Sequence, residues 1–345
     1  MAEFEPAKAT INDVAAAAGV SKKTVSRVIN NEPNVRKETR ERVQEAMSAL
    51  NYFPNMSARS LASKRSYLVA MLYFDVGAFY LHQLQSGLLD HFALRGYSLL
   101  MQPCEGEVEQ IVAMIEQKAR YMNIDGFVLV PPLVCIPAVA ELLKRMNKPY
   151  VRITPLDEYD GFSEVLCDDE QSTYDLTCHL IDQGHKNIAF VKGDPSCLAT
   201  KMRFDGFSRA LNERGLVRRE EWVVEGTYAF DSGVTAGEKL LSSDAYPSAI
   251  VCSNDDMAAG VLAVAHEKGL QVPTDVSVTG FDDSPLASQT WPALTSVRQP
   301  NRRMAEIAAN KLIDRIENIE GAEYPQNRSC EIVYRASTEG RAARQ

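Results

Sequence analysis

The sequence has no long apolar run. No stretch of its 345 residues approaches the roughly 20 consecutive apolar side chains that a membrane-spanning helix needs. The opening residues, MAEFEPAK, contain two acids and few apolar side chains, so we expect no secretory signal peptide. These absences predict a cytoplasmic protein with no membrane partner, and they argue against an exported transport protein.

Cysteine pairs and enzyme signatures are also missing. The seven cysteines are odd in number and include no CxxC pair, which favours reduced core thiols over disulfides or a zinc site. The five histidines show no i, i+4 pairing, and the motifs GxSxG, HExxH, GxxxxGK and GxGxxG are absent. Asp282 and Asp283 could form a carboxylate pair, but no catalytic motif accompanies them. We therefore expect no catalytic residues, no metal and no cofactor, and hence no enzyme.

Positive charge is scarce overall but concentrated near the N-terminus. Residues 8–65 contain 11 Lys and Arg against 5 Asp and Glu, a net charge of +6, so the total of −9 leaves −15 for the rest. A basic head of this kind attracts the phosphates of nucleic acid, whereas an acidic body is repelled by them. Because most charge runs are only solvated helix faces, charge alone does not settle the function.

Three helices are predicted in the basic head. Residues 11–18 have apolar side chains at i, i+3, i+4 and i+7, preceded by Thr10 with Asp13 as a capping box and followed by Gly19 as the terminating residue. Ser21 caps a second helix over 22–30. A third helix over 37–50 packs behind the pair, and the short turn between the first two is typical of a helix-turn-helix.

The second of these helices has a polar face without acids. Val25 and Val28 are expected in the core, and the opposite face carries Lys22, Lys23, Ser26, Arg27 and Asn30. A helix in the DNA major groove needs such donors, since Lys and Arg match guanine and Asn matches adenine. A generic three-helix bundle is the alternative, and the coincidence of turn, caps and acid-free face favours DNA reading.

The motif DVA..AGVS..TVSRV.N, followed by V...TR..V..A...L.Y.PN..AR.L., resembles the headpiece of the LacI/GalR (lactose-repressor) family. The resemblance implies that Lys22, Lys23 and Arg27 read bases. It also implies that Ser21, Thr24 and Ser26 contact the DNA backbone, so the predicted partner is a double-stranded, pseudo-palindromic operator.

Residues 55–63 (NMSARSLAS) form a predicted hinge. The segment is too short and too poor in apolar residues to be a stable helix alone. By resemblance, Asn55 belongs to the DNA contacts, and Leu61 is the wedge that enters a minor-groove base step when two hinges of a dimer pair. In isolation, a plain linker would be the better interpretation.

The acidic body alternates short apolar runs with longer amphipathic segments, the pattern of βαβ units and parallel sheets. Eight strands exceed one comfortable domain, so we expect two doubly wound lobes with a ligand between them at the carboxyl ends of the strands. The candidate strands are 67–74, 97–102, 126–131, 149–153, 187–193, 222–226, 249–254 and 276–281.

The markers IDGFVLV, GHKNIAFVKGD, RFDGF, PSAIVCSNDDMAAGV and VPTDVSVTGFDD extend the resemblance to the family's periplasmic-binding-protein-like effector domain. The resemblance implies that the chain crosses between lobes near Ser163, Val297 and Tyr324. The implied domains are a headpiece at 8–54, a hinge and linker at 55–65, lobe one at 66–163 and 298–324, lobe two at 164–297 and 325–339, and a tail at 340–345.

Candidate effector contacts follow the strand ends. Arg203, Asn254 and Asp282 match positions that bind the effector in the family, and a sugar needs such groups for its hydroxyls and an aromatic face for its ring. Tyr228 and Phe79 are the aromatic candidates, and Asp75 is a further polar one. Each of these residues could instead form a surface salt bridge or fill the core.

These features together predict an allosteric, sugar-induced transcription repressor. The alternative is a repressor of the same fold with a purine or phosphorylated metabolite as corepressor, although few basic residues fall at the strand ends. A homodimer is expected, cytoplasmic and associated with the nucleoid when bound to its operator. The apolar stripe of a helix over 301–319 is either the dimer face or core.

Overall fold

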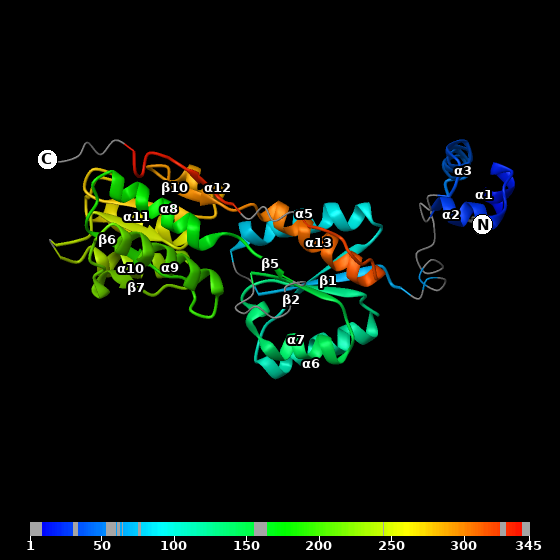
Figure 1. The fold of residues 1–345 in the computed structure, drawn as a ribbon, viewed down its shortest axis with the longest axis horizontal. Helices are drawn as coiled ribbons and strands as arrows, with labels where there is room; N and C mark the ends of the chain where they lie inside the picture. The colour runs from blue at the N-terminus through cyan, green and yellow to red at the C-terminus, as the bar shows by residue number, and fades with distance from the viewer. Residues whose placement is uncertain are drawn as a thin grey trace, which may run out of the picture. The chain divides into compact units, whose positions relative to one another are not determined.

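The structure is a computed structural model, and it describes residues 9–29, 34–52, 60, 63, 65–74, 77–154, 164–243, 245–324 and 329–339. Asn30, Asn55, Leu61 and Asp75, all predicted ligand or DNA contacts, lie outside these residues. The chain divides into two compact units, residues 1–66 and residues 67–345, which we call the headpiece and the body (Figure 1). No helix in the described ranges combines the length and hydropathy needed to cross a membrane.

The headpiece contains the three predicted helices, α1 (Ile11–Ala18), α2 (Lys22–Ile29) and α3 (Lys37–Ala49). The capping box of Thr10 and Asp13 is present, and Gly19 adopts the left-handed conformation with φ 64°. Helix α3 ends one residue before the predicted end, because Leu50 leaves the helix as its C-cap. Local sequence signals therefore determine the boundaries of this small unit.

A compact apolar core joins the three helices. Val14 of α1, Val25 of α2 and Val43 of α3 are fully buried in one cluster. Arg40 of α3 donates to the carbonyl of Val28 at 3.5 Å, which ties α3 to the last turn of α2. The polar face of α2 is thereby directed away from the core.

The body comprises two α/β lobes, each built on one sheet. The elements of the first sheet and its helices are β1 (Leu68–Tyr73), α5 (Ala78–Leu94), β2 (Ser98–Pro103), α6 (Val108–Tyr121), β3 (Gly126–Leu129), η1 (Leu133–Cys135), α7 (Pro137–Arg145), β4 (Tyr150–Ile153), β5 (Glu164–Val165) and α13 (Asn301–Glu317). Those of the second are α8 (Asp169–Asp182), β6 (Ile188–Val191), α9 (Leu198–Glu213), η2 (Glu220–Trp222), β7 (Val223–Val224), α10 (Phe230–Leu240), β8 (Ala249–Cys252), α11 (Asp255–Glu267), β9 (Ser277–Phe281), α12 (Pro285–Gln289), β10 (Thr295–Arg298) and β11 (Glu331–Val333).

Lobe one has five parallel strands in the order β2-β1-β3-β4-β5. Alternate residues of the strands face opposite sides, so Met71 packs under α5 and α13 while Leu72 packs under α6 and α7. Figure 1 shows these helix pairs on the two faces of the sheet. The lobe is therefore a three-layer sandwich whose strands all end at one edge.

Lobe two repeats this plan with the order β11-β10-β9-β8-β6-β7, in which only β11 is antiparallel to its neighbour. Leu176 of α8 and Phe207 of α9 pack on one face, and Leu240 of α10 and Val261 of α11 pack on the other. In both lobes the strand order places a topological switch point at the carboxyl edge, where ligands bind in such folds.

All eight candidate strands are present, and the predicted doubly wound lobes are confirmed. Three strands lie outside these eight candidates, β5, β10 and β11, because runs of two to four residues give no usable periodicity. The apolar stripe of α13 is core and not a dimer face, since Met304, Ala308 and Leu312 are buried against the first sheet. Helix α13 ends at Glu317, where Asn318 turns left-handed.

Candidate effector cleft and DNA-binding face

Helix α2 presents a basic polar face. Lys22 and Lys23 are exposed at its first turn, and Ser26 and Arg27 are half-buried one turn later. No acidic residue occurs in the helix, which has Arg27 in its last turn. A face with cations and hydroxyls only is what phosphate and base-edge contacts require.

Ser21 shapes the start of this helix. Its hydroxyl accepts a hydrogen bond from the Thr24 amide at 3.1 Å and lies 3.0 Å from the Thr24 hydroxyl. The cap holds both hydroxyls at the positively polarised end of α2, which attracts phosphate. Ser21 and Thr24 therefore act on the helix terminus as a pair.

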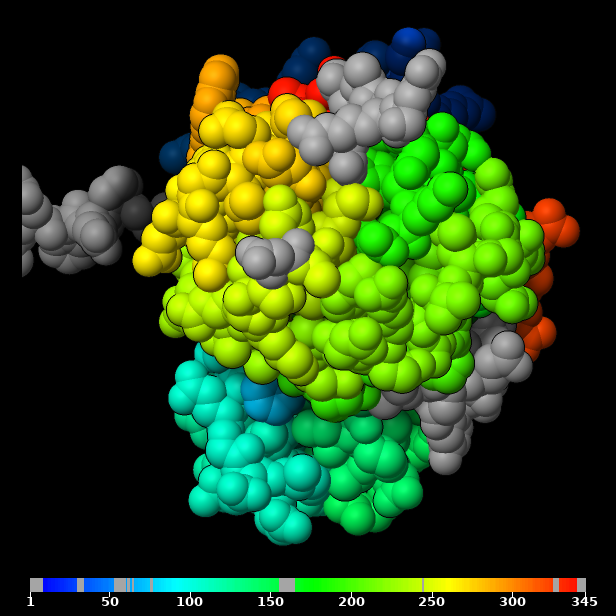
Figure 2. Space-filling view, turned by 90° about the vertical axis from the view of Figure 1, so that its left-hand side faces the viewer, coloured from blue at the N-terminus to red at the C-terminus, as the bar shows by residue number. Residues whose placement is uncertain are grey.

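The body has a cleft, partly open to solvent, at the carboxyl edges of both sheets, where ligands bind in such folds. In Figure 2 the yellow-green atoms of lobe two rest directly above the cyan atoms of lobe one. The lining residues are Gly77, Tyr80, Pro131, Pro132, Thr154, Asp169, Asp194, Cys197, Ala199, Arg203, Thr227, Tyr228, Asn254, Asp282 and Gln299.

Arg203 is the buried cation of the cleft. Its Nε donates to Asp169 Oδ1 at 2.7 Å, its Nη1 donates to the carbonyl of Ser253, and its guanidinium lies 3.6 Å from the ring centre of Phe281. Burial acts to lower the pKa of Arg203, but electrostatic attraction, chiefly from Asp169, outweighs it, so the net pKa is raised. The side chain is therefore fixed and charged.

Asp169 has one satisfied oxygen and one unsatisfied one. Its side chain is 1% exposed, and although Oδ1 accepts from Arg203, the buried Oδ2 has no hydrogen-bond partner. A buried acceptor without a partner is costly unless a ligand or water fills it. Oδ2 is therefore available to a ligand hydroxyl.

Asp282 lies on the same side of the cleft. Burial raises its pKa to about 8, against the opposing charge of Arg203, and Gln299 donates to its Oδ1 at 2.5 Å. At neutral pH the carboxyl is thus mostly protonated and can both donate and accept hydrogen bonds. This versatility suits a ligand with hydroxyl groups.

Asn254 and Tyr228 supply further polar groups to the cleft. Asn254 caps α11 by accepting from the Met257 amide at 3.0 Å, and its amide nitrogen donates to the Tyr228 carbonyl at 2.8 Å. The Tyr228 hydroxyl lies 2.7 Å from that of Thr200. A Cβ on Gly193 would come within 2.0 Å of the Tyr228 ring, so glycine is required there.

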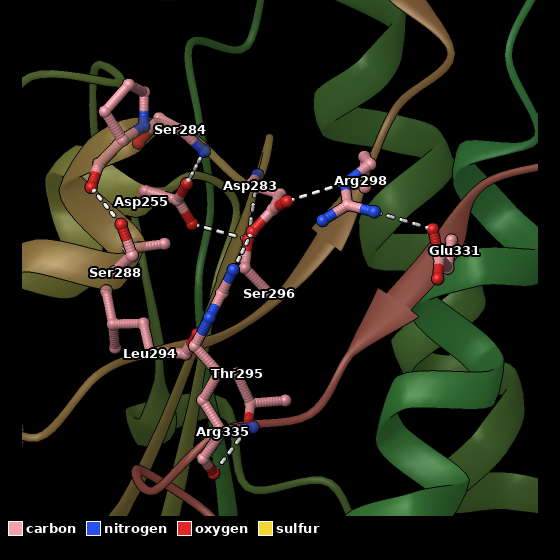
Figure 3. A network of polar contacts seen from close by, with 12 residues as sticks. Asp255, Asp283, Ser284, Ser288, Leu294, Thr295, Ser296, Arg298, Glu331 and Arg335 are labelled. Atoms are coloured by element: carbon pink, nitrogen blue, oxygen red, sulfur yellow. Dashed lines mark hydrogen bonds and ion pairs between the residues drawn. The ribbon is translucent and has the colours of Figure 1, made fainter.

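Asp283 is directed away from the cleft and is not paired with Asp282. It accepts from Arg298 Nε at 2.7 Å and from Arg335 at 2.5 Å, while Arg298 also reaches Glu331 at 2.8 Å (Figure 3). Asp283 therefore links the end of β9 to β10 and β11.

Asp255 also stabilises the region around the end of β9. It accepts from the Ser296 hydroxyl at 2.6 Å and from the Ser284 amide at 2.7 Å (Figure 3), and burial raises its pKa to about 6. These contacts hold the loop that carries Asp282.

Three lining residues other than glycine have a left-handed backbone: Thr154 at φ 51°, Tyr228 at φ 64° and Asp282 at φ 107°. Each is costly for a residue with a side chain and persists only where surrounding contacts impose it, as they do in ligand sites.

Four of the six predicted effector residues line the cleft together: Arg203, Tyr228, Asn254 and Asp282. Phe79 does not, and its neighbour Tyr80 does, because consecutive helix residues point about 100° apart. Asp169 was missed because an acid in the first turn of a helix usually just complements the helix dipole. Gln299 was missed because β10, which precedes it, was not predicted.

Among the described residues, no group of three or more His, Cys, Asp or Glu side chains could hold a metal ion. None of the seven cysteines, all of which are described, is in a disulfide.

Comparison with known proteins adds the family. Residues 10–55 match the profile of bacterial regulatory proteins of the lacI family, and residues 177–338 match that of a periplasmic binding protein-like domain. Catabolite control protein A of Priestia megaterium is 37% identical over 306 residues, covering 88% of this chain and 91% of that protein.

Solved structures of transcription regulators are similar to this chain as well. The transcriptional regulator CelR–cellobiose complex is similar at 29% identity and a TM-score of 0.72, covering 95% of this chain and 99% of that one. The lac repressor dimer bound to operator and the anti-inducer ONPF is similar at 26% identity and a TM-score of 0.76, covering 96% and 99%. The chain belongs to the lacI family of bacterial regulatory proteins, as a transcription repressor with a helix-turn-helix headpiece and an effector-binding body.

Proposed function

We propose that this repressor holds a pseudo-palindromic operator as a homodimer and releases it when a sugar binds in the cleft. The observation that carries the proposal is the polar wall of the cleft. The charge of Arg203 is balanced there by Asp169, and an unsatisfied carboxylate oxygen remains.

The charge balance of the cleft disfavours a phosphorylated ligand. Its lining includes three acids, Asp169, Asp194 and Asp282, and a single base, Arg203. A phosphate group would require several uncommitted cations or amides. A neutral polyhydroxylated molecule needs instead the mixed donors and acceptors that these side chains offer.

Aromatic and apolar groups supply the complementary surface. Tyr80, Pro131 and Pro132 from lobe one line the same cleft, opposite the charged residues of lobe two. A sugar ring has C–H faces that pack on such groups while its rim hydroxyls bind the polar wall. Among the similar proteins, the CelR complex contains cellobiose, which supports a sugar here.

On the DNA side, we assign base reading to Lys22, Lys23 and Arg27, with Ser21, Thr24 and Ser26 on the backbone and Asn30 beside them. The exposed basic face of α2 supports this assignment. We further propose that residues 8–54 are the DNA-binding domain of the headpiece and 55–65 the hinge, in which Asn55 contacts DNA and Leu61 enters the minor groove.

Release requires that the sugar bind one arrangement of the lobes more tightly than the other, because a ligand with equal affinity for both shifts nothing. The cleft is lined by both lobes, so a ligand there senses their relative rotation. In the released arrangement the paired hinges cannot form, and operator affinity falls.

The test is a titration of operator release. A duplex selected from a random library is labelled, and its fluorescence anisotropy with the full chain is followed against cellobiose, lactose, glucose, glucose 6-phosphate, hypoxanthine and guanine. The proposal expects release by a neutral sugar. Tighter binding with a purine or with the phosphorylated sugar would establish the corepressor alternative instead.

We also propose a cytoplasmic, nucleoid-associated homodimer without enzymatic activity. The similar lac repressor structure is a dimer on its operator, which supports the assembly. Sedimentation at micromolar concentration is expected to give twice the chain mass, and a stable tetramer would contradict the proposal.

A further inference from the structure

Cys167 and Cys330 form a thiol pair far apart in sequence and close in space. Their Sγ atoms lie 2.8 Å apart across 163 residues of chain. A disulfide joins two sulfurs at about 2.0 Å, so the bond needs a movement of less than about 1 Å.

The pair joins two of the connections between the lobes. Cys167 follows β5, the last strand of lobe one, and precedes α8 of lobe two. Cys330 immediately precedes β11, where the chain returns from lobe one to lobe two, and it packs against the cores of both lobes. A covalent bond here would fasten the first crossing to the third.

The two thiols differ in exposure and acidity. Cys167 is 2% exposed and Cys330 is half-buried. The hydrogen bond from Cys167 lowers the pKa of Cys330 most, with help from the Ser172 hydroxyl and against burial. The same hydrogen bond and burial raise the pKa of Cys167. Cys330 is thus the nucleophile, and Cys167 is the resolving thiol that attacks oxidised Cys330.

Three other thiols lack this activation. Burial raises the pKa of both Cys104 and Cys197 to about 11 and that of Cys252 still further. Because the thiolate is the reactive form, these buried cysteines are inert by comparison.

We propose that Cys167 and Cys330 are a peroxide-sensitive redox site that locks the connection between the lobes. The Cys330 thiolate attacks hydrogen peroxide, so that an S–O bond forms, the O–O bond breaks and hydroxide leaves. The Cys167 sulfur then attacks the Cys330 sulfenic acid, the S–S bond forms, and the oxygen leaves as water with the Cys167 proton. Two thiols are oxidised by two electrons, and one peroxide is reduced to two waters.

The functional consequence rests on the proposed function. Cys167 lies two residues before Asp169, the partner of Arg203 in the cleft, so the bond would fix the segment that carries one wall of the site. Lobes fastened at two crossings cannot rotate freely. The oxidised repressor is expected to keep its operator and lose release by the effector.

The experiment counts thiols in the full chain. Reduced protein is treated with hydrogen peroxide, unfolded and titrated with a thiol reagent, and the linked peptides are mapped by mass spectrometry. The wild type should fall from its seven thiols to five and yield a 167–330 peptide, and dithiothreitol should restore all seven. Cys330→Ser should keep all its thiols, whereas the half-buried control Cys135→Ser should still lose two.

A second variant isolates the intermediate. Cys167→Ser lacks the resolving thiol, so dimedone should label Cys330 as the sulfenic acid in that variant far more than in the wild type. Equal thiol loss in Cys330→Ser, or linkage of another pair, would overturn the proposal.

The operator assay then separates the two ideas. Oxidised protein that still releases its operator with the effector would overturn the lock. If no effector makes the reduced protein release its operator, the proposed function is contradicted, while the thiol count is unaffected.

Discussion

The recognition helix and the effector cleft use positive charge in opposite ways. On α2, Lys22 and Lys23 are exposed at a surface without acids. In the cleft, Arg203 is 5% exposed and held by a carboxylate and a carbonyl. An exposed cation gains by releasing counterions from a phosphate chain, whereas a buried and neutralised one can only orient an uncharged partner. Four substitutions test this difference.

The largest effect is expected from Arg203→Met. Removing the guanidinium leaves Asp169 buried with neither oxygen satisfied and Asp282 without its opposing charge. We expect the free energy of unfolding in urea to fall by about 3–5 kcal/mol and effector binding to be lost. The control Arg214→Met breaks an exposed pair with Asp182 and should cost less than about 1 kcal/mol. Equal losses in both variants would show that burial does not distinguish Arg203.

Arg27→Ala tests the recognition helix α2. Operator affinity is expected to fall by about 1–3 kcal/mol, with relaxed preference at one base pair, as anisotropy on single-substitution operators would measure. The exposed Arg42 of α3 is the matched control and should change affinity far less. Uniform weakening on every duplex would instead identify Arg27 as a phosphate contact.

Tyr80→Ala and Phe79→Ala compare two neighbours on α5. Tyr80 lines the cleft and Phe79 does not. Loss of the ring contact should weaken effector binding by about 1 kcal/mol in the Tyr80 variant, measured by calorimetry with the sugar that releases the operator. An equal loss in the Phe79 variant would mean that the helix start, and not the ring, forms this part of the site.

The effect expected from Asp282→Asn depends on pH. Because burial raises the pKa of Asp282 to about 8, the folded protein keeps a proton that the unfolded chain loses above about pH 4. Stability therefore falls as pH rises from 4 to 8, and asparagine removes that loss. From pH 5 to pH 8 the loss amounts to about 4 kcal/mol, so the variant's melting temperature should gain on the wild type by about 8–16 °C between pH 5 and pH 9. A gap that does not change with pH would contradict a buried, protonated carboxyl.

Local chemistry made the headpiece predictable. Thr10, Asp13 and Gly19 act on backbone groups within a few residues, so the sequence alone defines where α1 begins and ends. Arg203, Asn254 and Asp282 were found for a related reason: they lie in motifs at strand ends or on the helix that follows, where ligands bind in such folds.

What the sequence did not reveal depends on orientation and on distant partners. Phe79 and Tyr80 differ only in helix phase, which a start uncertain by one residue reverses. The stripe on α13 has the same periodicity whether it covers its own sheet or another subunit. The contact of Cys167 with Cys330 depends on how the chain passes between the lobes, which no local pattern encodes.

The return of α13 to the first lobe also affects biosynthesis. Val69, Val128 and Val151 line a sheet face whose cover includes Met304 and Leu312, synthesised more than 150 residues later. While the ribosome makes the second lobe, the first has an uncovered apolar surface that only the C-terminal part of the chain can close. The first lobe is therefore the first to be synthesised and the last to complete its folding. A truncated chain would expose a surface prone to aggregation.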